Sequence, residues 1–349
     1  MRSIRHGSHR RRLAALFLVV APLVSVMACG GTDGGDSGEG GMTSVTVGKA
    51  VDTIGFTAVD VAIQQGFFEE QGIQAKTVLL AGSSVTNSAM QAGDIQFAAG
   101  ASLPLLLARQ EGLPLVSVVS MDFGVPLQLI VGGSRKEQVS ADDSFAERME
   151  ALEGAKIGHV SSTDGGFIDL LAERAGMAKG SVQKVTFQSA AAAVTAVEQG
   201  AVDAAIGSPP TTLAAVERGK AVVAANAAEV PEYKDMTYDI LTTTEEFAAQ
   251  NKETVKGVAT AIAKADNFME EKANSEDVLA LEQEHFPSYS PEVLTQSLDL
   301  VEFARDGQQT SERWANAVDT YIAGGQIEPT DAPEGEVWTN EYIDKRALR

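Results

Sequence analysis

Over residues 45–224, segments in which apolar residues recur at every second position alternate with segments in which they recur every three to four positions. This pattern predicts strands interleaved with helices. Strands are predicted at 45–48, 73–80, 95–98, 115–119 and 127–131, and again at 156–160, 184–187, 204–206 and 222–224. Helices are predicted between them at 58–65, 83–91, 103–109, 165–175, 190–199 and 210–218. Strands that alternate with helices are typical of βαβ units, so we expect parallel sheets in two successive α/β halves.

The pattern changes after residue 245, where only helical periodicity remains. Helices are predicted at 252–271, 275–285, 291–303 and 311–323, with Pro287 and Pro291 between the second and the third. The chain is therefore expected to be an α/β protein with a helical C-terminal part.

The first residues have a different character. Five arginines precede an apolar stretch at 13–26, and small residues then lead to Cys29, the only cysteine. This is the layout of a secretory signal, and the run Val26, Met27, Ala28, Cys29 resembles a bacterial lipobox. The resemblance implies a signal peptide at 1–28 and a lipid on Cys29 that anchors the protein outside the cytoplasm.

Two alternatives are a cleaved signal that leaves a free thiol and a single transmembrane anchor. The apolar stretch is short for a spanning helix, which needs about 20 residues. Residues 29–43 are rich in glycine and acid and have almost nothing to bury, so they are expected to form a flexible tether. No later apolar run is long enough to span a bilayer, which predicts a soluble body.

Charge narrows the choice of partners. The chain carries 27 basic and 48 acidic residues, and five of its arginines lie in the leader. A body this acidic argues against nucleic acid and against electrostatic attachment to anionic lipid. Its length suffices for two domains of ordinary size.

Four segments then occur in a specific order. They are GFFEEQGI at 66–73, AGDIQFA at 92–98, LEGAKIG at 152–158 and VEQGAVDAA at 197–205. Together they resemble the substrate-binding proteins of ABC importers for nitrate, sulfonates, taurine and pyrimidine precursors of thiamine. The resemblance covers roughly residues 45–240.

This resemblance implies the two-lobed type II periplasmic-binding-protein fold, with a ligand cleft between the lobes. One lobe would comprise 45–123 and 240–349 and the other 124–239, with crossings near 121–125 and 238–242. Ligand would close the cleft of a monomeric receptor, which would then dock on the permease and ATPase subunits of an importer. The chain departs from the family pattern at 52–56 and at 207–210, so the ligand is not transferred from any relative.

Ligand contacts are expected beyond the carboxyl ends of the strands, where helix N-termini offer unpaired N–H groups. The candidates are Asp52, Thr53, Phe56, Ser83, Ser84, Ser102, Asp122, Ser161, Ser162, Thr163, Asp164, Ser208 and Thr211. The alternative for the serines and for Asp164 is helix capping. Phe56 and also Phe123 could line the cleft, and the alternative for both is that they belong to the hydrophobic core.

Asp52, Asp122 and Asp164 fall at strand ends, where Lys49 is the one cation. Acids and hydroxyls favour a ligand with hydrogen-bond donors, such as an amine or an aminopyrimidine. A nitrate or sulfonate held by helix N-termini is the second hypothesis.

An enzyme is the other class to weigh. The body has two histidines, His159 and His285, and His159 and Ser161 lie near enough in sequence to form a pair. No cluster of histidine and cysteine, nucleophile elbow or P-loop is present, so we expect no catalytic residue, metal or cofactor. An enzyme of the same fold that makes thiamine or pyrimidine precursors and a tethered sensory module remain as alternatives.

Overall fold

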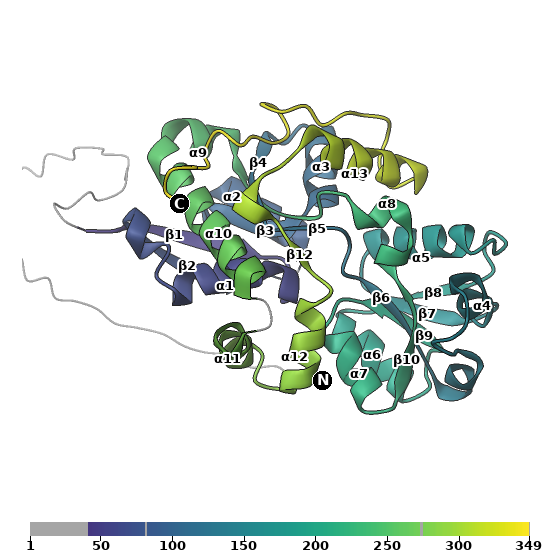
Figure 1. Cartoon of the computed structure of the whole chain (residues 1–349). Coiled ribbons are helices and arrows are strands. Elements are labelled where there is room, and N and C mark those ends of the chain that lie inside the picture. The colour runs from purple at the N-terminus through teal and green to yellow at the C-terminus, as the bar shows by residue number, and fades with distance from the viewer. Residues whose placement is uncertain (1–40, 81, 273–274, 349) are drawn as a thin grey trace, which may run out of the picture. The chain divides into compact units, whose positions relative to one another are not determined.

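The structure is a computed structural model in which residues 41–80, 82–272 and 275–348 are described (Figure 1). The predicted signal peptide, the lipidation site at Cys29 and most of the predicted tether lie outside these residues. Within them, no helix is both long and apolar enough to cross a membrane.

Most strands of the described residues belong to two sheets. The first sheet has the order β2-β1-β3-β11-β4 and comprises β1 (Thr43–Lys49), β2 (Ile73–Leu79), β3 (Phe97–Ala101), β4 (Leu115–Ser120) and β11 (Asp239–Thr244). The second has the order β10-β6-β9-β7-β8 and comprises β6 (Gln128–Gly132), β7 (Lys156–His159), β8 (Gln183–Thr186), β9 (Ala204–Gly207) and β10 (Ala221–Asn226). A small ribbon pairs β5 (Asp122–Phe123) with β12 (Glu302–Phe303).

The parallel strands predicted from the βαβ pattern are present, but each of the two sheets also contains antiparallel strands. β1, β2 and β3 are parallel to one another, as are β7, β8 and β9. β11 runs antiparallel to both β3 and β4, and β6 runs antiparallel to both β9 and β10. The reason is connectivity, because β6 and β11 each follow a segment that arrives from the other sheet instead of a helix that returns to the same sheet.

The helices agree with the predictions over most of the chain. They are α1 (Thr57–Gln64), α2 (Ser83–Ala92), α3 (Ser102–Gln110), α4 (Phe145–Glu150), α5 (Ser162–Arg174), α6 (Ala190–Glu198), α7 (Thr211–Glu217), α8 (Pro231–Lys234), α9 (Glu245–Gln250), α10 (Lys252–Lys272), α11 (Glu276–His285), α12 (Pro291–Leu298) and α13 (Ser311–Ala323). The helix predicted at 291–303 ends at Leu298, since residues 302–303 pair with β5. Ser161, Ser189, Ser275, Ser290 and Thr310 cap helices with their hydroxyls.

Two segments connect the sheets, residues 121–127 and residues 227–238. The second crossing was expected at 238–242, but 239–244 form β11 of the first sheet. The two segments touch, because Phe123 and Thr237 form a bridge. Arg313 of α13 lies over the ring of Phe123 at 3.5 Å and pairs with Asp235 and Glu302. The division of the chain into two lobes stays a prediction.

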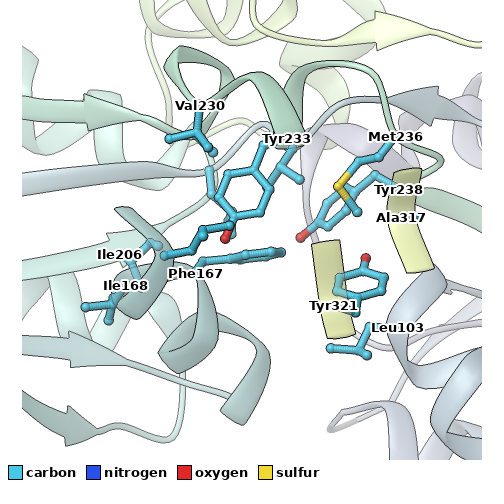
Figure 2. Packing of buried hydrophobic residues seen from close by; sticks show 14 of the residues in the cluster. Leu103, Phe167, Ile168, Ile206, Val230, Tyr233, Met236, Tyr238, Ala317 and Tyr321 are labelled. Carbon is cyan, nitrogen blue, oxygen red and sulfur yellow. The ribbon is translucent and has the colours of Figure 1, made fainter. Parts of the chain in front are cut away.

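A buried aromatic cluster lies where the helices of the second sheet meet α13 (Figure 2). Phe167 of α5 packs edge-on against Tyr233, with ring centroids 4.7 Å apart, and its centroid is 6.3 Å from that of Tyr238. Tyr321 of α13 and Leu103 of α3 belong to the same core. This core is continuous between the elements around the two sheets.

Candidate functional site

Two carboxyl groups meet where the first sheet joins the connecting segments. Asp122 is the first residue of β5 and Asp239 the first of β11, and the Asp239 N–H donates to Asp122 Oδ1 at 2.8 Å. A Cβ placed on Gly55 would lie 2.0 Å from Asp239 Oδ2 and 2.8 Å from Asp122 Oδ2. The β1–α1 loop therefore lies directly on the two carboxyl groups, and glycine is required there by its lack of a side chain.

Both carboxyl groups are buried, and this changes how they titrate. Burial, reinforced by the nearby charge of Asp239, raises the pKa of Asp122 well above its usual value. Burial also raises the pKa of Asp239 to about 7, although the hydrogen bond between its carboxyl group and that of Asp122 opposes this. The pair therefore holds a proton at neutral pH and can donate as well as accept a hydrogen bond.

Three buried polar atoms in this region have no hydrogen-bond partner in the protein, apart from the proton that the Asp122 carboxyl group shares with that of Asp239. They are Thr53 Oγ1 in the β1–α1 loop, Asp122 Oδ2, and Thr237 Oγ1 in the second connecting segment. Buried polar atoms are nearly always hydrogen-bonded, so a concentration of unpaired ones is typical of a place built to receive a polar group. We call Thr53, Asp122, Thr237 and Asp239 the junction site.

Ser102 borders the junction site but is already bonded. Its hydroxyl is fully buried, donates to the Thr237 carbonyl at 2.8 Å and lies 2.9 Å from the Tyr321 hydroxyl. It thus ties α3 and α13 to the second connecting segment. Tyr238, which follows Thr237, is buried against Phe167.

A charged cluster surrounds Lys49 at the end of β1. Its Nζ lies 2.9 Å from Asp52 Oδ1 and 2.9 Å from Asp60 Oδ2, and 3.3 Å from His285 Nε2. His285 also lies 3.0 Å from Asp52 Oδ1 and 3.4 Å from Asp60 Oδ2. Asp52, predicted to meet the ligand, is paired with both Lys49 and His285, and its side chain is 39% exposed.

These partners shift the titration of each group. The hydrogen bond with His285 lowers the pKa of Asp52 to about 2, opposed by burial and reinforced by Lys49. The same bond with Asp52 raises the pKa of His285 despite partial burial. Burial alone would lower the pKa of Lys49, but the charge of Asp60 and the bonds to both carboxylates raise it overall. One turn before His285, burial raises the pKa of Glu282 to about 8.

The other first-sheet candidates are placed differently. Phe56 is buried in the core, as its alternative interpretation had it. Ser83 lines a cavity of about 20 Å³ together with Ala50, Gly100 and Ala101, whereas Ser84 is exposed on α2. Val51, Leu79 and Val85 are exposed near the same ends of the strands.

The second-sheet candidates gather at the starts of α5 and α7. Asp164 Oδ2 accepts the N–H groups of Val160 and Ser161, and Ser161 Oγ accepts that of Asp164, so both residues cap α5. The Thr163 carbonyl accepts from Gln326, and the Thr211 hydroxyl lies 3.2 Å from that of Tyr289.

Two further candidates carry less information. Ser208 is half-buried between β9 and α7. Ser162 begins α5, and its side chain lies outside the described part of the chain.

The conceivable pair of Ser161 and His159 does not form. His159 Nδ1 lies 2.8 Å from the Ser161 carbonyl oxygen, and its Nε2 lies 3.3 Å from the Thr186 hydroxyl. Among the described residues, no three histidine, cysteine or acidic side chains are arranged to hold a metal ion.

Sequence reasoning missed Thr237 and Asp239, although Asp239 begins a strand at a crossing as Asp122 does. It also missed Asp60 and the role of His285. A cavity of about 640 Å³ between the connecting segments and the helical tail is lined by Phe123 but by none of the other residues predicted to meet the ligand.

Solved structures share this architecture. The ligand-binding component of an ABC-type import system from Staphylococcus aureus superposes with a TM-score of 0.72 at 12% identity, covering 88% of this chain and all of that one. The periplasmic aliphatic sulphonate-binding protein of Escherichia coli gives 0.65 at 18%, covering 86% and 99%. The periplasmic nitrate-binding protein of Synechocystis gives 0.60 at 16%, covering 72% and 69%.

These similarities establish the fold predicted from the sequence, the periplasmic-binding-protein fold. A comparison with curated protein sequences finds no significant match. A model of the family described as NMT1/THI5 like matches residues 53–274, which include α1, both connecting segments and the whole second sheet. The chain belongs to the NMT1/THI5-like family.

Proposed function

We propose that this protein is the solute-binding component of an ABC importer and that its ligand binds at the junction site. The single observation that carries the site is the group of buried oxygens of Thr53, Asp122 and Thr237, which have no partner in the protein other than the Asp239 carboxyl group beside Asp122. They come from the β1–α1 loop and from both connecting segments, so a ligand that bonds to them would favour one arrangement of the two sheets.

The titration of the junction site supports a ligand with hydrogen-bond donors. A protonated amine or an aminopyrimidine would find an acceptor in Asp122 Oδ2 and would take the place of the proton that the pair otherwise holds. A sulfonate or nitrate would meet unfavourable charge there and would depend on the N-termini of α2 and α5 instead. The donor-bearing organic ligand is therefore our first choice.

The rest of the proposal follows the sequence. Cys29 would carry the lipid that anchors the receptor to the cell membrane outside the cytoplasm, and the residues from there to the start of β1 at Thr43 would tether it. Residues 45–123 with 240–349 and residues 124–239 would close on the ligand as two lobes of a monomer. The closed receptor would deliver the ligand to permease and ATPase subunits.

Thermal unfolding of the purified protein with single ligands tests this proposal. The panel comprises aminopyrimidines, simple amines, taurine, alkanesulfonates and nitrate. Ligand at a thousand times its Kd stabilises the folded state by about 4 kcal/mol, which raises the Tm by several degrees. We expect a shift with donor-bearing ligands that Asp122→Asn weakens.

The matched control is Asp299→Asn, which removes an exposed carboxylate at the end of α12. A Tm shift with nitrate or sulfonates that Asp122→Asn leaves unchanged would contradict the junction site. Conversion of a ligand into a product would contradict a binding role.

A further inference from the structure

Two consecutive glycines lie in the first turns of α5, close to the predicted ligand loop at 161–164. Glycine is a poor helix former, so its presence at each of these two helical positions needs a structural explanation. A Cβ on Gly165 would meet Lys184 and His159 only at ordinary contact distances of 3.7–3.9 Å. A Cβ on Gly166 would lie 2.5 Å from both Cδ and Nε2 of Gln326.

Gln326 therefore occupies the space that a side chain at 166 would fill. Its Nε2 donates to the Thr163 carbonyl at 3.1 Å, on the turn that begins α5. Its own backbone N–H donates to the Tyr321 carbonyl at 2.8 Å, which fixes Gln326 to the end of α13. The amide side chain thus bridges the helical tail and the start of α5.

The other end of this bridge is rigid. Tyr321 contacts the Ser102 hydroxyl of α3, and Trp314 Nε1 donates to Gln309 within the same buried region. Tyr321 and Trp314 are both fully buried. α13 is also held by the second connecting segment, because Asn316 Nδ2 donates to the carbonyls of Glu232 and Asp235. Gln326 therefore links the start of α5 to a helix that contacts both α3 and α8.

We infer that Gln326 is a positioning residue that holds the loop at 161–164 in register with the first sheet, and that Gly166 exists to admit it. The role in ligand binding rests on the proposed function, whereas the contact itself does not. Gln326 lies beyond residues 53–274, the part of the chain that the family model matches.

Hydrogen–deuterium exchange of the ligand-free protein tests the contact. In Gln326→Ala, the amides at the start of α5 should exchange about fivefold faster, the effect of losing one hydrogen bond of ordinary strength. Gly166→Ala should produce the same change by displacing Gln326. Gly165→Ala is the matched control, since alanine favours the helix equally at both positions but only residue 166 contacts Gln326.

The double variant with Gly166→Ala and Gln326→Ala should exchange no faster than Gln326→Ala alone, because both changes remove the same contact. Equal exchange in the two glycine variants, or unchanged exchange in Gln326→Ala, overturns the inference. Once a ligand is identified, Gln326→Ala should weaken its binding severalfold. If Gln326→Ala exchanges faster but no ligand of the panel binds to the protein, the contact is established and only the proposed function is contradicted.

Discussion

Gly55 and Asp239 lie so close together that a Cβ on the glycine would be 2.0 Å from Oδ2 of the carboxyl group. The β1–α1 loop and the start of β11 therefore form one tightly packed unit. A change in the protonation or position of Asp239 should therefore alter the position of the loop, because there is no free space between them.

Replacing Gly55 with alanine should destabilise the protein by about 1–3 kcal/mol, the usual cost of forcing an extra carbon into a packed site. The penalty is steric, since the φ of Gly55 is not positive. Urea unfolding measures it. Gly100→Ala is the control, because a Cβ there would meet nothing within 4 Å; an equal loss in both variants would contradict the prediction.

The stability of the protein should fall as the pH rises towards 7, in part because of Asp239. Its pKa in the folded protein is about 7 against an ordinary 3.8. The stability it contributes is therefore fully present below pH 3.8 and is lost as the pH rises through about 7. Asp239→Asn should flatten this part of the curve, as urea unfolding at pH 4.5 and pH 8 would reveal. Asp299→Asn should not, and an unchanged slope in Asp239→Asn would refute the assignment.

His285 should titrate above its ordinary pKa of 6.5, because its bond with Asp52 favours the protonated ring. Its contribution to stability is present below pH 6.5 and disappears as the pH rises through the raised value. NMR of the ring protons measures this titration, and His159→Gln removes the other ring of the described residues from the spectrum. Asp52→Asn should lower the pKa of His285, and a pKa that stays where it was would show that the cluster is not its cause.

Ser102→Ala should cost about 1–3 kcal/mol, since the Thr237 carbonyl and the Tyr321 hydroxyl both lose a partner in a buried place. Chemical denaturation measures the loss. Ser84→Ala removes an exposed hydroxyl from the neighbouring helix and should change stability by less than about 0.5 kcal/mol. A negligible effect of Ser102→Ala would contradict this prediction and would mean that a water molecule takes the place of the Ser102 hydroxyl group.

Local periodicity was enough to predict most helices and strands, as with the helix at 311–323, which the structure reproduces to the residue. It could not predict that β6 and β11 run antiparallel to their neighbours. The direction of a strand depends on the sheet from which the preceding segment comes. The sequence of a strand of five or six residues does not indicate this direction.

The candidate site shows the same limit. Asp122 was singled out because it ends a predicted strand, but its partner Asp239 is 117 residues away and only the fold brings them together. His285 reaches Asp52 across 233 residues, from the helical C-terminal part of the chain. Asp164 illustrates the opposite case, because helix capping is local and the serine and aspartate three residues apart indicate it directly.

The position of β11 between β3 and β4 has a consequence for the order in which the chain folds. β4 pairs with no strand of its sheet other than β11 among the described residues, and β11 begins only at residue 239. When synthesis has reached residue 226, every strand of the second sheet has been made, whereas β11, with which β4 pairs, has not yet been synthesised. We therefore expect the second sheet, although later in the chain, to form during synthesis before the first is complete. Until then, the open edges of β3 and β4 are the part of the nascent chain most exposed to mispairing.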